Sequence, residues 1–551
     1  MNNVPVPTND KENENIRRID VIDVVRLTDE DDIEVLLLIF DFIQRQYVLE
    51  DILRTEISPE SIRRVILKHA GICTDAKKDC KFILNKVDKL LFLNTTTSSQ
   101  ISAKHFKLGW VFTCDLYFNA HQQYSVVGVE NSVYSGTYAV TPTGCLDDFV
   151  VLFNTVLIDN VPMQAVMCMA AAATVLPYAN QMWGLSLYNP INHLIGNSTT
   201  GKTTAAYLFA SFGGAPEGRD GFMFSFLGTE NAIIKQVGNI AGYPIAIDEF
   251  STGLSKTGWS NFVYTMANGR GKVRCQAGGS RVQQVDEFST VFLTTGEMSI
   301  LRKCNKNEGI RARLFEYQLD TSWTRSAEES DLIKSVCKRN YGLITPLIAQ
   351  ELLKNGAAWE SRFRKWRERT IELIRAKKLL LGISDRVSDF VALYMVSCEI
   401  LMSVLGIEMK KYSIFDFFFL HILVKNAQDA NLGMRTYETI VAYLSKNRHL
   451  YPELVPLGDD FIMESDIEGF IAESHKGKVI NGKKYRDYAV FDVDILDTVL
   501  LRRGFSDPKV ALRALQKDGY LLTKDKNRLY IERRVNGITT RVYGVWVDIS
   551  W

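Results

Sequence analysis

The sequence predicts an α/β protein whose core is a parallel sheet covered by helices on both faces, and three observations support this prediction. Residues 191–195 form a short strand-like run that leads into the glycine-rich segment 196–204, and a helical run follows. Residues 243–250 and 289–293 are two further strand-like runs, and each leads into polar residues. Strands that alternate with helical segments are typical of such a three-layer α/β sheet.

The composition of the 551 residues is that of a globular protein, since 46% are hydrophobic and 23% are charged. The net charge of +1 excludes a chain that is basic over its whole surface. The charges are placed unevenly. Residues 1–60 hold 15 acidic and 6 basic side chains, whereas residues 476–551 hold 9 acidic and 16 basic side chains. We therefore expect the two ends to contact different partners or each other.

The nine cysteines and seven histidines are scattered along the chain. They form neither a C-x-x-C pair nor an H-E-x-x-H motif, so we do not expect a metal held by protein side chains alone. The odd number of cysteines and the lack of a leader-like start predict a reducing cytoplasm. The apolar run 165–176 is about 12 residues long, short of the roughly 20 of a membrane span, so we expect a buried helix and no membrane contact.

Changes in composition divide the chain into five expected regions. They are a mostly helical N-terminal domain with a disordered start (1–100), a strand-rich and helical segment (101–187), the α/β core (188–325), a helical lid or linker (326–450) and a C-terminal domain (451–551).

Local signals predict the elements of the first two regions. We expect a helix after Thr28, capped by its hydroxyl, because the four acidic residues that follow would stabilise the positive end of the helix dipole. A second helix should begin after Ser58, with Pro59 in its first turn, and a third should cover residues 82–93. Aromatic and β-branched runs predict strands over residues 106–157.

Residues 196–204, GNSTTGKTT, form the strongest motif of the sequence. They fit G-x-x-x-x-G-K-[ST] between a predicted strand and a predicted helix, the context in which this pattern binds nucleotide phosphates. Lys202 would reach the β- and γ-phosphates of ATP, and the Thr203 hydroxyl would ligate Mg²⁺. The alternative is a glycine-rich turn with a solvated lysine. The predicted nucleotide-binding residues are Gly196, Asn197, Ser198, Thr199, Thr200, Gly201, Lys202, Thr203 and Thr204.

Two acidic residues end the second strand-like run. Asp248 would hold Mg²⁺ through water, and Glu249 would orient and polarise the attacking water. The alternative is a plain acidic strand end or helix cap. The third run leads to Thr294 and Thr295, one of which would touch the γ-phosphate or the lytic water, the role called sensor 1. We favour Thr295, with a purely structural threonine as the alternative.

Arg311 and Arg313 follow the third run in the segment GIRARLFEY. An arginine at this place in ring ATPases can reach the γ-phosphate of a neighbouring subunit, and such a finger is worth roughly 10³–10⁵ in rate. The sequence leaves open which of the two would serve. It also leaves open that each is an ordinary surface or salt-bridged arginine.

Residues 268–285 alternate with a period of two around a Gly-Gly pair, which predicts a β-hairpin. Its basic face would track a phosphate backbone inside the channel of a ring. The alternative is an edge hairpin whose charges prevent aggregation. The basic side chains on it are Arg270, Lys272, Arg274 and Arg281.

The C-terminal region resembles a winged helix. Its helices would cover residues 494–501 and 508–517, and wing strands would flank Asn536-Gly537. Three basic residues share one face of the second helix and could contact phosphates or a groove of DNA. The alternative is a module that only packs. These residues are Lys509, Arg513 and Lys517.

Taken together, the motifs resemble the AAA+ family first catalogued as domain of unknown function 927. That family includes the self-loading, MCM-like helicases of mobile elements such as staphylococcal cassette chromosomes. The likeness covers about residues 55–420. Besides the phosphate loop, it is carried by Leu108-Gly109-Trp110, Tyr134-x-Gly136, Thr143-Gly144, IDEF at 247–250, A-N-G-R-G-K-V-R at 267–274, L-T-T-G-E at 293–297, and the lid-like segment opened by Arg386.

The resemblance implies a hexameric AAA+ ring that encircles single-stranded or forked DNA, with ATP sites between subunits. It implies that Arg386 is a sensor-2 residue and that Arg311 or Arg313 is the finger. It makes the hairpin at 268–285 similar to the presensor-1 hairpin of MCM and superfamily 3 helicases. We therefore expect an ATP hydrolase that acts as a DNA helicase or replication initiator of a mobile element. The alternatives are an ATP-switched DNA-binding regulator and an AAA+ assembly that acts on a protein partner, neither of which unwinds DNA.

Overall fold

The fold is given by a computed structural model, in which the chain forms two compact units. Unit 1 is Met1–Pro142 with Asn239–Ala241, and unit 2 is Thr143–Gly238 with Gly242–Trp551. The residues that the structure describes are 19–29, 32–96, 103–113, 115–226, 230–250, 258–271, 286–304, 308–377, 379, 384–425, 432–455, 460–464, 467–503, 505, 507–525 and 527–548.

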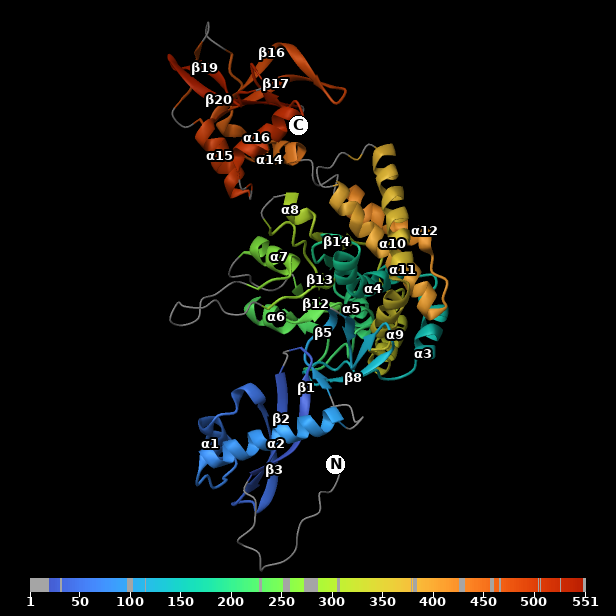
Figure 1. Cartoon of the computed structure of the whole chain (residues 1–551). Coiled ribbons are helices and arrows are strands. Elements are labelled where there is room, and N and C mark those ends of the chain that lie inside the picture. Colours follow the sequence, from blue (N-terminus) through green and yellow to red (C-terminus); the bar gives the residue numbers. More distant parts are fainter. Residues whose placement is uncertain are drawn as a thin grey trace, which may run out of the picture. The chain divides into compact units, whose positions relative to one another are not determined.

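Unit 1 is built on a nine-stranded sheet with the strand order β11-β5-β6-β7-β8-β4-β1-β2-β3 (Figure 1). Two helices, α1 (Pro59–Lys68) and α2 (Ala76–Thr96), pack on β1, β2 and β3, and this small core includes the fully buried Val35, Leu37 and Ile83. The strands are β1 (Ile19–Leu27), β2 (Asp32–Asp41), β3 (Gln46–Leu53), β4 (Ala103–His105), β5 (Leu108–Phe112), β6 (Leu116–Asn119), β7 (Gln122–Ser125), β8 (Val129–Tyr134) and β11 (Ile240–Ala241).

The predicted helix after Thr28 is wrong, because β1 and β2 form an antiparallel pair there. In β2 the buried Val35 and Leu37 alternate with more exposed neighbours, which is the period of a strand. Asp29 was expected to stabilise the start of a helix. Its carboxylate instead accepts a hydrogen bond of 2.7 Å from the N–H of Lys107, a residue far along the chain. The region 1–100 is therefore a mixture of strands and helices in its described part.

Two other N-terminal helices are confirmed. Ser58 caps α1: its hydroxyl accepts from the N–H of Ser61 at 3.2 Å, and the Ser61 hydroxyl accepts from the N–H of Ser58 at 2.9 Å. This reciprocal pair is a capping box, and it satisfies N–H groups that the first turn leaves open. The predicted helix at 82–93 lies inside α2.

The strand prediction for residues 106–157 holds only as far as the end of β8. Residues 146–157 form the helix α3 (Leu146–Leu152) and one π-helical turn, η2 (Phe153–Leu157). Their apolar residues recur at a spacing of three and four, which is the period of a helix buried on one face. The buried side chains with this spacing are Phe149, Leu152, Phe153 and Val156.

The predicted apolar helix at 165–176 is confirmed as part of α4 (Val161–Met182), which is capped by the Asn160 side chain. By length and composition, α4 and residues Arg386–Leu405 are the two described helices that could cross a membrane. Their apolar windows are 89% and 72% buried inside the protein. Both therefore pack as core helices of this fold.

The core of unit 2 is a five-stranded parallel sheet with the strand order β10-β12-β13-β9-β14. The helix α5 (Lys202–Ser211) packs on β12 and β13 and lies beside α4 (Figure 1). The strand β13 therefore separates β9, which precedes the glycine-rich loop, from β12, which ends at Asp248 and is followed by Glu249. The strands are β9 (Ile191–Ile195), β10 (Met223–Ser225), β12 (Ile245–Asp248), β13 (Phe292–Gly296) and β14 (Leu314–Gln318).

Helices surround this sheet and follow it in the sequence. The described part of 326–450 is almost wholly helical, in agreement with the sequence prediction. The remaining helices of the core are α6 (Glu230–Val237), α7 (Trp259–Asn268), α8 (Glu308–Arg311), α9 (Ala327–Arg339), α10 (Ile344–Ala376), α11 (Ser384–Leu405), α12 (Lys411–Phe418) and η4 (Phe419–Val424).

The C-terminal module has its own hydrophobic core between helices and a sheet, with Leu496, Leu512 and Val545 fully buried. The two helices and the hairpin expected there are present: α15 (Val493–Arg502), α16 (Pro508–Lys517), and β19 (Ile531–Val535) with β20 (Ile538–Val547). The other elements are α14 (Leu432–Lys446), η5 (Arg448–Leu450), β15 (Asp460–Phe461), β16 (Gly469–Ile480), β17 (Lys483–Asp492) and β18 (Leu521–Leu522).

Candidate functional site

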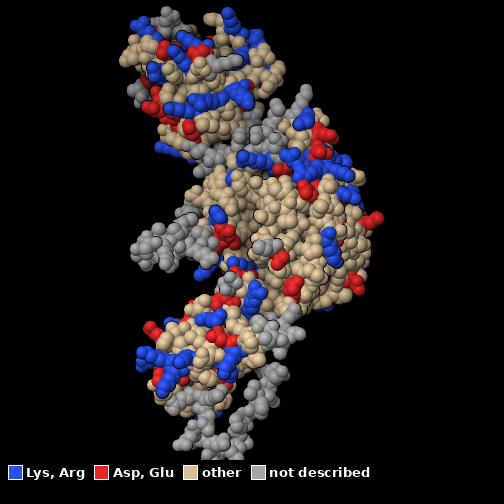
Figure 2. Space-filling view, in the orientation of Figure 1, with Lys and Arg blue, Asp and Glu red and all other residues tan. Residues whose placement is uncertain are grey.

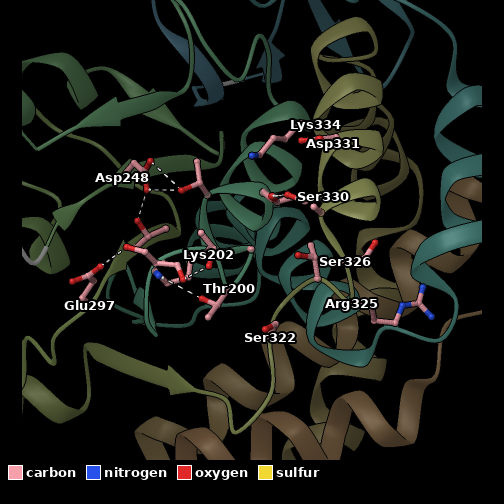
Figure 3. Close-up of a pocket in the computed structure, with 18 of the residues that line it drawn as sticks. Thr200, Lys202, Asp248, Glu297, Ser322, Arg325, Ser326, Ser330, Asp331 and Lys334 are labelled. Atoms are coloured by element: carbon pink, nitrogen blue, oxygen red, sulfur yellow. Dashed lines mark hydrogen bonds between the residues drawn. The ribbon is translucent and has the colours of Figure 1, made fainter.

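A cavity of about 610 Å³ lies at the carboxyl ends of β9, β12 and β13 (Figure 3). The parallel register places Ile195 level with Gly296 and Ile247 level with Thr294, so the loops that leave these strands meet. Such a crevice is where α/β proteins bind ligands. The described residues that these loops contribute are Ser198, Thr199, Thr200, Gly201, Lys202, Thr203, Thr204, Asp248, Glu249, Thr295, Gly296 and Glu297.

The phosphate loop, residues 196–204, is shaped by a sharp turn before α5. Gly201 has a φ of +86°, and a Cβ atom added there would lie 2.5 Å from the hydroxyl oxygen of Thr324. Both the backbone conformation and the close approach therefore require glycine. From the same side, the N–H of Trp323 donates to the carbonyl of Thr200 at 2.7 Å. The conformation of the loop is thus held by contacts with Trp323 and Thr324 as well as by its own sequence.

The Lys202 ammonium lies inside the curve of this loop. Its Nζ donates to the carbonyls of Gly196 at 2.8 Å and Asn197 at 2.6 Å, and the residue is only 9% exposed. Burial lowers the pKa of Lys202, while the charges of Glu297 and Asp248 act in the opposite direction. A loop that opens a helix N-terminus and encloses an ammonium group is suited to bind a phosphate.

Thr203 and Asp248 provide the oxygen atoms that a magnesium ion prefers. The Thr203 hydroxyl lies 3.4 Å from Oδ2 and 3.5 Å from Oδ1 of Asp248. Mg²⁺ is usually bound by few protein oxygens together with substrate phosphates and water. This pair of residues, next to the phosphate loop, fits that donor set.

Thr295 links the two acidic residues of the site. Its hydroxyl donates to Oδ1 of Asp248 and accepts from the N–H of Glu249 at 3.1 Å. One side chain therefore fixes both the carboxylate of Asp248 and the backbone of its neighbour. Because Thr295 lies in β13 and Asp248 is the last residue of β12, this contact also ties the two strand ends together.

Glu249 has a φ of +55°, a left-handed conformation that is uncommon for a residue with a side chain. Its exposed side chain lines the cavity, while the next residue, Phe250, is buried among Phe226, Trp259 and Phe262. The turn between these residues places a carboxylate on the cavity side and an aromatic ring in the core. A conformation of this kind costs free energy and is often found where function requires it.

The neighbouring threonines face in different directions. Thr294 is fully buried, and its hydroxyl forms a 2.8 Å hydrogen bond with Nδ1 of His193 in β9. Burial lowers the pKa of His193 to about 4, and its Nε2 lies 3.0 Å from the carbonyl oxygen of Met298. The cavity is lined by Thr295 and not by Thr294 in the described structure. The buried His193–Thr294 pair was not anticipated from the sequence.

The wall opposite the strand ends comes from the loop before α9 and the first turns of α9, and the sequence did not predict it. In Figure 3, Ser326, Ser330, Asp331 and Lys334 line this side. The hydroxyl of Ser330 contacts that of Thr204 in the phosphate loop. The N-cap serine followed by acidic residues marks the start of this helix in the sequence, but nothing local marks its position at the cavity. The other described residues of the wall are Ser322, Thr324, Arg325 and Ala327.

The three arginines expected to complete the site do not belong to the described lining of the cavity. Arg311 and Arg313 are 7% and 8% exposed. The Arg313 guanidinium lies over the ring of Tyr188, with 3.7 Å between its carbon and the ring centroid, and donates to the carbonyl of Gly309 at 2.6 Å. Arg386 lies near the start of α11 and is exposed.

The basic residues predicted to contact DNA fall into two groups. Of those in the predicted hairpin, Arg270 forms a 2.6 Å ion pair with Glu287, and Lys272, Arg274 and Arg281 lie outside the described residues. All three in the C-terminal module are exposed on one face of α16, opposite the buried residues Ala511, Leu512 and Leu515. These three are Lys509, Arg513 and Lys517.

Comparison with known proteins places the chain in a family and finds solved structures that resemble it. The model of the family described as "Domain of unknown function (DUF927)" matches residues 8–286, slightly more than half of the chain. The chain is similar to a solved structure described as "SCCmec type IV Cch - active helicase", with a TM-score of 0.74 and 18% identity. The match covers 95% of this chain and 92% of that one, and it shows a shared fold. No protein with curated annotation matches.

Proposed function

The chain belongs to the DUF927 family, and on this premise we propose that it is an ATP-dependent DNA helicase or replication initiator of a mobile genetic element. The observation that carries the proposal is the convergence of Lys202, Thr203, Asp248, Glu249 and Thr295 on one cavity. The structural relative is described as an active helicase, and the fold that it shares with this chain adds support.

Each residue has a defined task in this proposal. The phosphate loop binds the phosphates of ATP through its N–H groups, and Lys202 neutralises the β- and γ-phosphates. Thr203 and Asp248 hold Mg²⁺, which when bound offsets phosphate charge. Glu249 orients and polarises the attacking water. Thr295 holds Asp248 and the backbone of Glu249 in position, which agrees with the sensor-1 role.

The ring is the second part of the proposal. In an AAA+ hexamer, Arg311 or Arg313 of one subunit would reach the ATP of the next, and Arg386 would act as sensor 2. Because Arg311 and Arg313 are buried in the single chain, assembly would have to expose the one that serves as the finger. The helices that follow β14 would form the lid. Deleting the guanidinium of the finger should lower hydrolysis by roughly 10³-fold or more without removing ATP binding.

DNA contact is the third part. The segment 268–285 would act as a hairpin inside the ring, and the C-terminal module would act as a winged helix with Lys509, Arg513 and Lys517 near the duplex. The positive charge of an exposed helix face supports phosphate contact. In the described part of the chain, the two helices long and apolar enough for a membrane span are mostly buried inside the protein, which is compatible with a cytoplasmic location.

The test is ATP-dependent unwinding of a forked DNA duplex, with Lys202→Ala as the matched control. Unwinding by the unsubstituted chain alone would establish a motor. If the chain forms rings and hydrolyses ATP but separates no strands, the helicase proposal is refuted. Stimulation of hydrolysis by DNA would then favour an ATP-switched DNA-binding regulator, and hydrolysis indifferent to DNA would favour action on a protein partner.

A further inference from the structure

A second basic element lies in the C-terminal module, apart from α16. The strands β16 and β17 form an antiparallel hairpin, and its tip, residues 474–486, contains no acidic residue. Figure 2 shows lysine and arginine side chains in several places on the visible face of this module, with acidic side chains among them. We call the lysine and arginine side chains of the tip the hairpin cations. They are Lys476, Lys478, Lys483, Lys484 and Arg486.

The hairpin is a defined structure and not a loose basic loop. Asn481 and Gly482 have φ of +51° and +80°, and two left-handed residues in a row form the tight turn that joins antiparallel strands. The core side of the tip is anchored, because Ile480 and Tyr485 are 5% and 7% exposed in the hydrophobic core of the module. The tip therefore presents its charges from a fixed backbone.

A large bulge gathers several hairpin cations at one place. Glu473 pairs with Asp487 and Lys478 pairs with Tyr485, so β16 advances five residues where β17 advances two. Four residues of β16, 474–477, therefore lie opposite the single residue Arg486. Gly477, within the bulge, has a φ of +61°, and a Cβ atom there would lie 2.7 Å from the carbonyl oxygen of Tyr485. Bulges of this kind redirect side chains and are frequent near functional sites.

The charges at the bulge are available to a ligand. Lys476, Lys484 and Arg486 are exposed, and within the described part of the chain none of them forms an ion pair. Lys483, by contrast, is paired with Asp548. The bulge begins at the acidic pair Glu473 and Asp487, and the charge of Arg486 acts on Asp487. The three exposed cations outnumber these two carboxylates, so an anion at the bulge would meet a net positive charge.

The hairpin also lies beside the end of α16. The Lys478 Nζ is 3.9 Å from the position that a Cβ atom would take on Gly519, two residues after the helix ends at Lys517. The basic face of α16 and the hairpin cations therefore belong to neighbouring parts of one module. A long polyanion could contact both, whereas a single small anion could not.

We propose that the hairpin cations bind the phosphate backbone of duplex DNA and form a second DNA contact beside α16. This inference rests on the proposed function of the chain and adds a site to it. Single-strand platforms stack bases on exposed aromatic rings, but Tyr485 and Tyr488 are each only 7% exposed. The tip therefore offers charge without a stacking surface, which suits the continuous phosphate backbone of a duplex.

The test compares two triple variants of the full chain. One is Lys476→Ala with Lys484→Ala and Arg486→Ala. The control is Lys77→Ala with Lys89→Ala and Arg63→Ala, which removes the same charges from exposed positions of α1 and α2. Binding to duplex and to single-stranded DNA is measured at several salt concentrations, together with ATP hydrolysis in the absence of DNA.

The hairpin variant should bind duplex DNA at least ten-fold more weakly at low salt. Its plot of log affinity against log salt should be shallower by about 2 to 3, because each lost phosphate contact removes roughly 0.9 from the slope. Hydrolysis without DNA should be unchanged, and the control should bind as the unsubstituted chain does. Restoring charge as Lys476→Arg with Lys484→Arg should preserve binding, which excludes misfolding as the cause.

Three results would overturn the proposal. Equal affinity and slope for the hairpin variant and the control would mean that the cations only keep the edge strand β16 soluble. A loss confined to single-stranded DNA would reject duplex as the ligand. If the unsubstituted chain binds no DNA at any salt concentration, the proposed function itself fails. That outcome is separate, because the first two require DNA binding by the unsubstituted chain.

Discussion

The core of unit 2 and the C-terminal module both carry basic side chains to which we assign a function, but these side chains differ in burial. In the core, Lys202 is 9% exposed and donates to two carbonyls of its own loop. In the module, Lys484 and Arg486 are exposed on a hairpin tip. A buried charge acts through fixed geometry, whereas exposed charges act through attraction that salt screens and that accumulates over several residues. Hydrolysis and DNA contact should therefore fail in different ways when residues are replaced.

The largest effect should come from Glu249→Gln. The amide cannot polarise water, so turnover should fall by on the order of 10²–10⁴. ATP should still bind, because the phosphate loop is unchanged. Phosphate release and nucleotide affinity are measured separately, with Glu372→Gln, exposed on α10, as the control. Turnover at the level of the unsubstituted chain would remove Glu249 from its assigned role.

Acid should destabilise the core through His193. Burial holds the pKa of His193 at about 4 in the folded state, against an ordinary value of 6.5. The unfolded chain therefore binds a proton at a pH where the folded chain does not, and stability is fully present only above about pH 6.5. As pH falls from 6.5 to 4, the loss should reach about 3 kcal/mol. Urea unfolding at a series of pH values, with His193→Gln for comparison, measures it. A pH dependence unchanged in that variant would contradict the assignment.

Gly201→Ala should distort the phosphate loop. The new Cβ would lie 2.5 Å from the Thr324 hydroxyl in a left-handed conformation, which by itself costs about 1–2 kcal/mol. Gly184→Ala is the matched control, since Gly184 also has a positive φ but has no atom near its Cβ position. Thermal unfolding and nucleotide affinity should both be worse for Gly201→Ala. Equal results for the two variants would mean that conformation alone, and not the contact with Thr324, makes glycine necessary.

The two threonines of β13 should separate stability from catalysis. Thr294→Val should cost about 1–3 kcal/mol, because it removes the partner of a buried His193 nitrogen, and should leave turnover per folded molecule intact. Thr295→Val should lower turnover with a smaller loss of stability, since it frees Asp248 and the N–H of Glu249. Unfolding curves and hydrolysis rates are compared for both. The reverse pattern would exchange the two roles.

The smallest effect per residue should be seen on α16. Replacing Lys509, Arg513 or Lys517 singly by alanine should weaken DNA binding by less than about 1 kcal/mol, because an exposed charge contributes little alone. The triple variant should lower the salt slope by about 2 to 3. A single replacement that abolishes binding would indicate a buried contact. The basic side chains of the module would then act as Lys202 does in the core, through fixed geometry.

Sequence reasoning succeeded where structure is set by neighbouring residues. The glycine-rich loop lies between its expected strand and helix, since the motif itself dictates its turn. The same reasoning found the hairpin at Asn536-Gly537 but missed the one at Asn481-Gly482, although both carry the same turn signal. The error after Thr28 has another cause. The acidic residue read as the start of a helix serves a contact with Lys107, and such distant partners leave no local signal.

The residues that line the cavity show the same limit of prediction from local sequence. The residues of its strand ends were predicted from three short segments, because parallel strands end at one edge of a sheet. Ser330, Asp331 and Lys334 were not, because their place in the wall depends on how α9 packs after β14. Of the two threonines, the sequence analysis favoured Thr295 as the one that faces the cavity, but only the structure gave His193 as the partner of the buried Thr294.

Trp323 connects the phosphate loop to a distant helix. Its N–H holds the carbonyl of Thr200, while its buried ring is 6.5 Å from that of Phe417 in α12. One residue therefore contacts the loop through its backbone and the helix α12 through its ring. Under the proposed function, a phosphate that displaced Thr200 on binding would therefore also displace the Trp323 ring, which packs against the helices beyond β14.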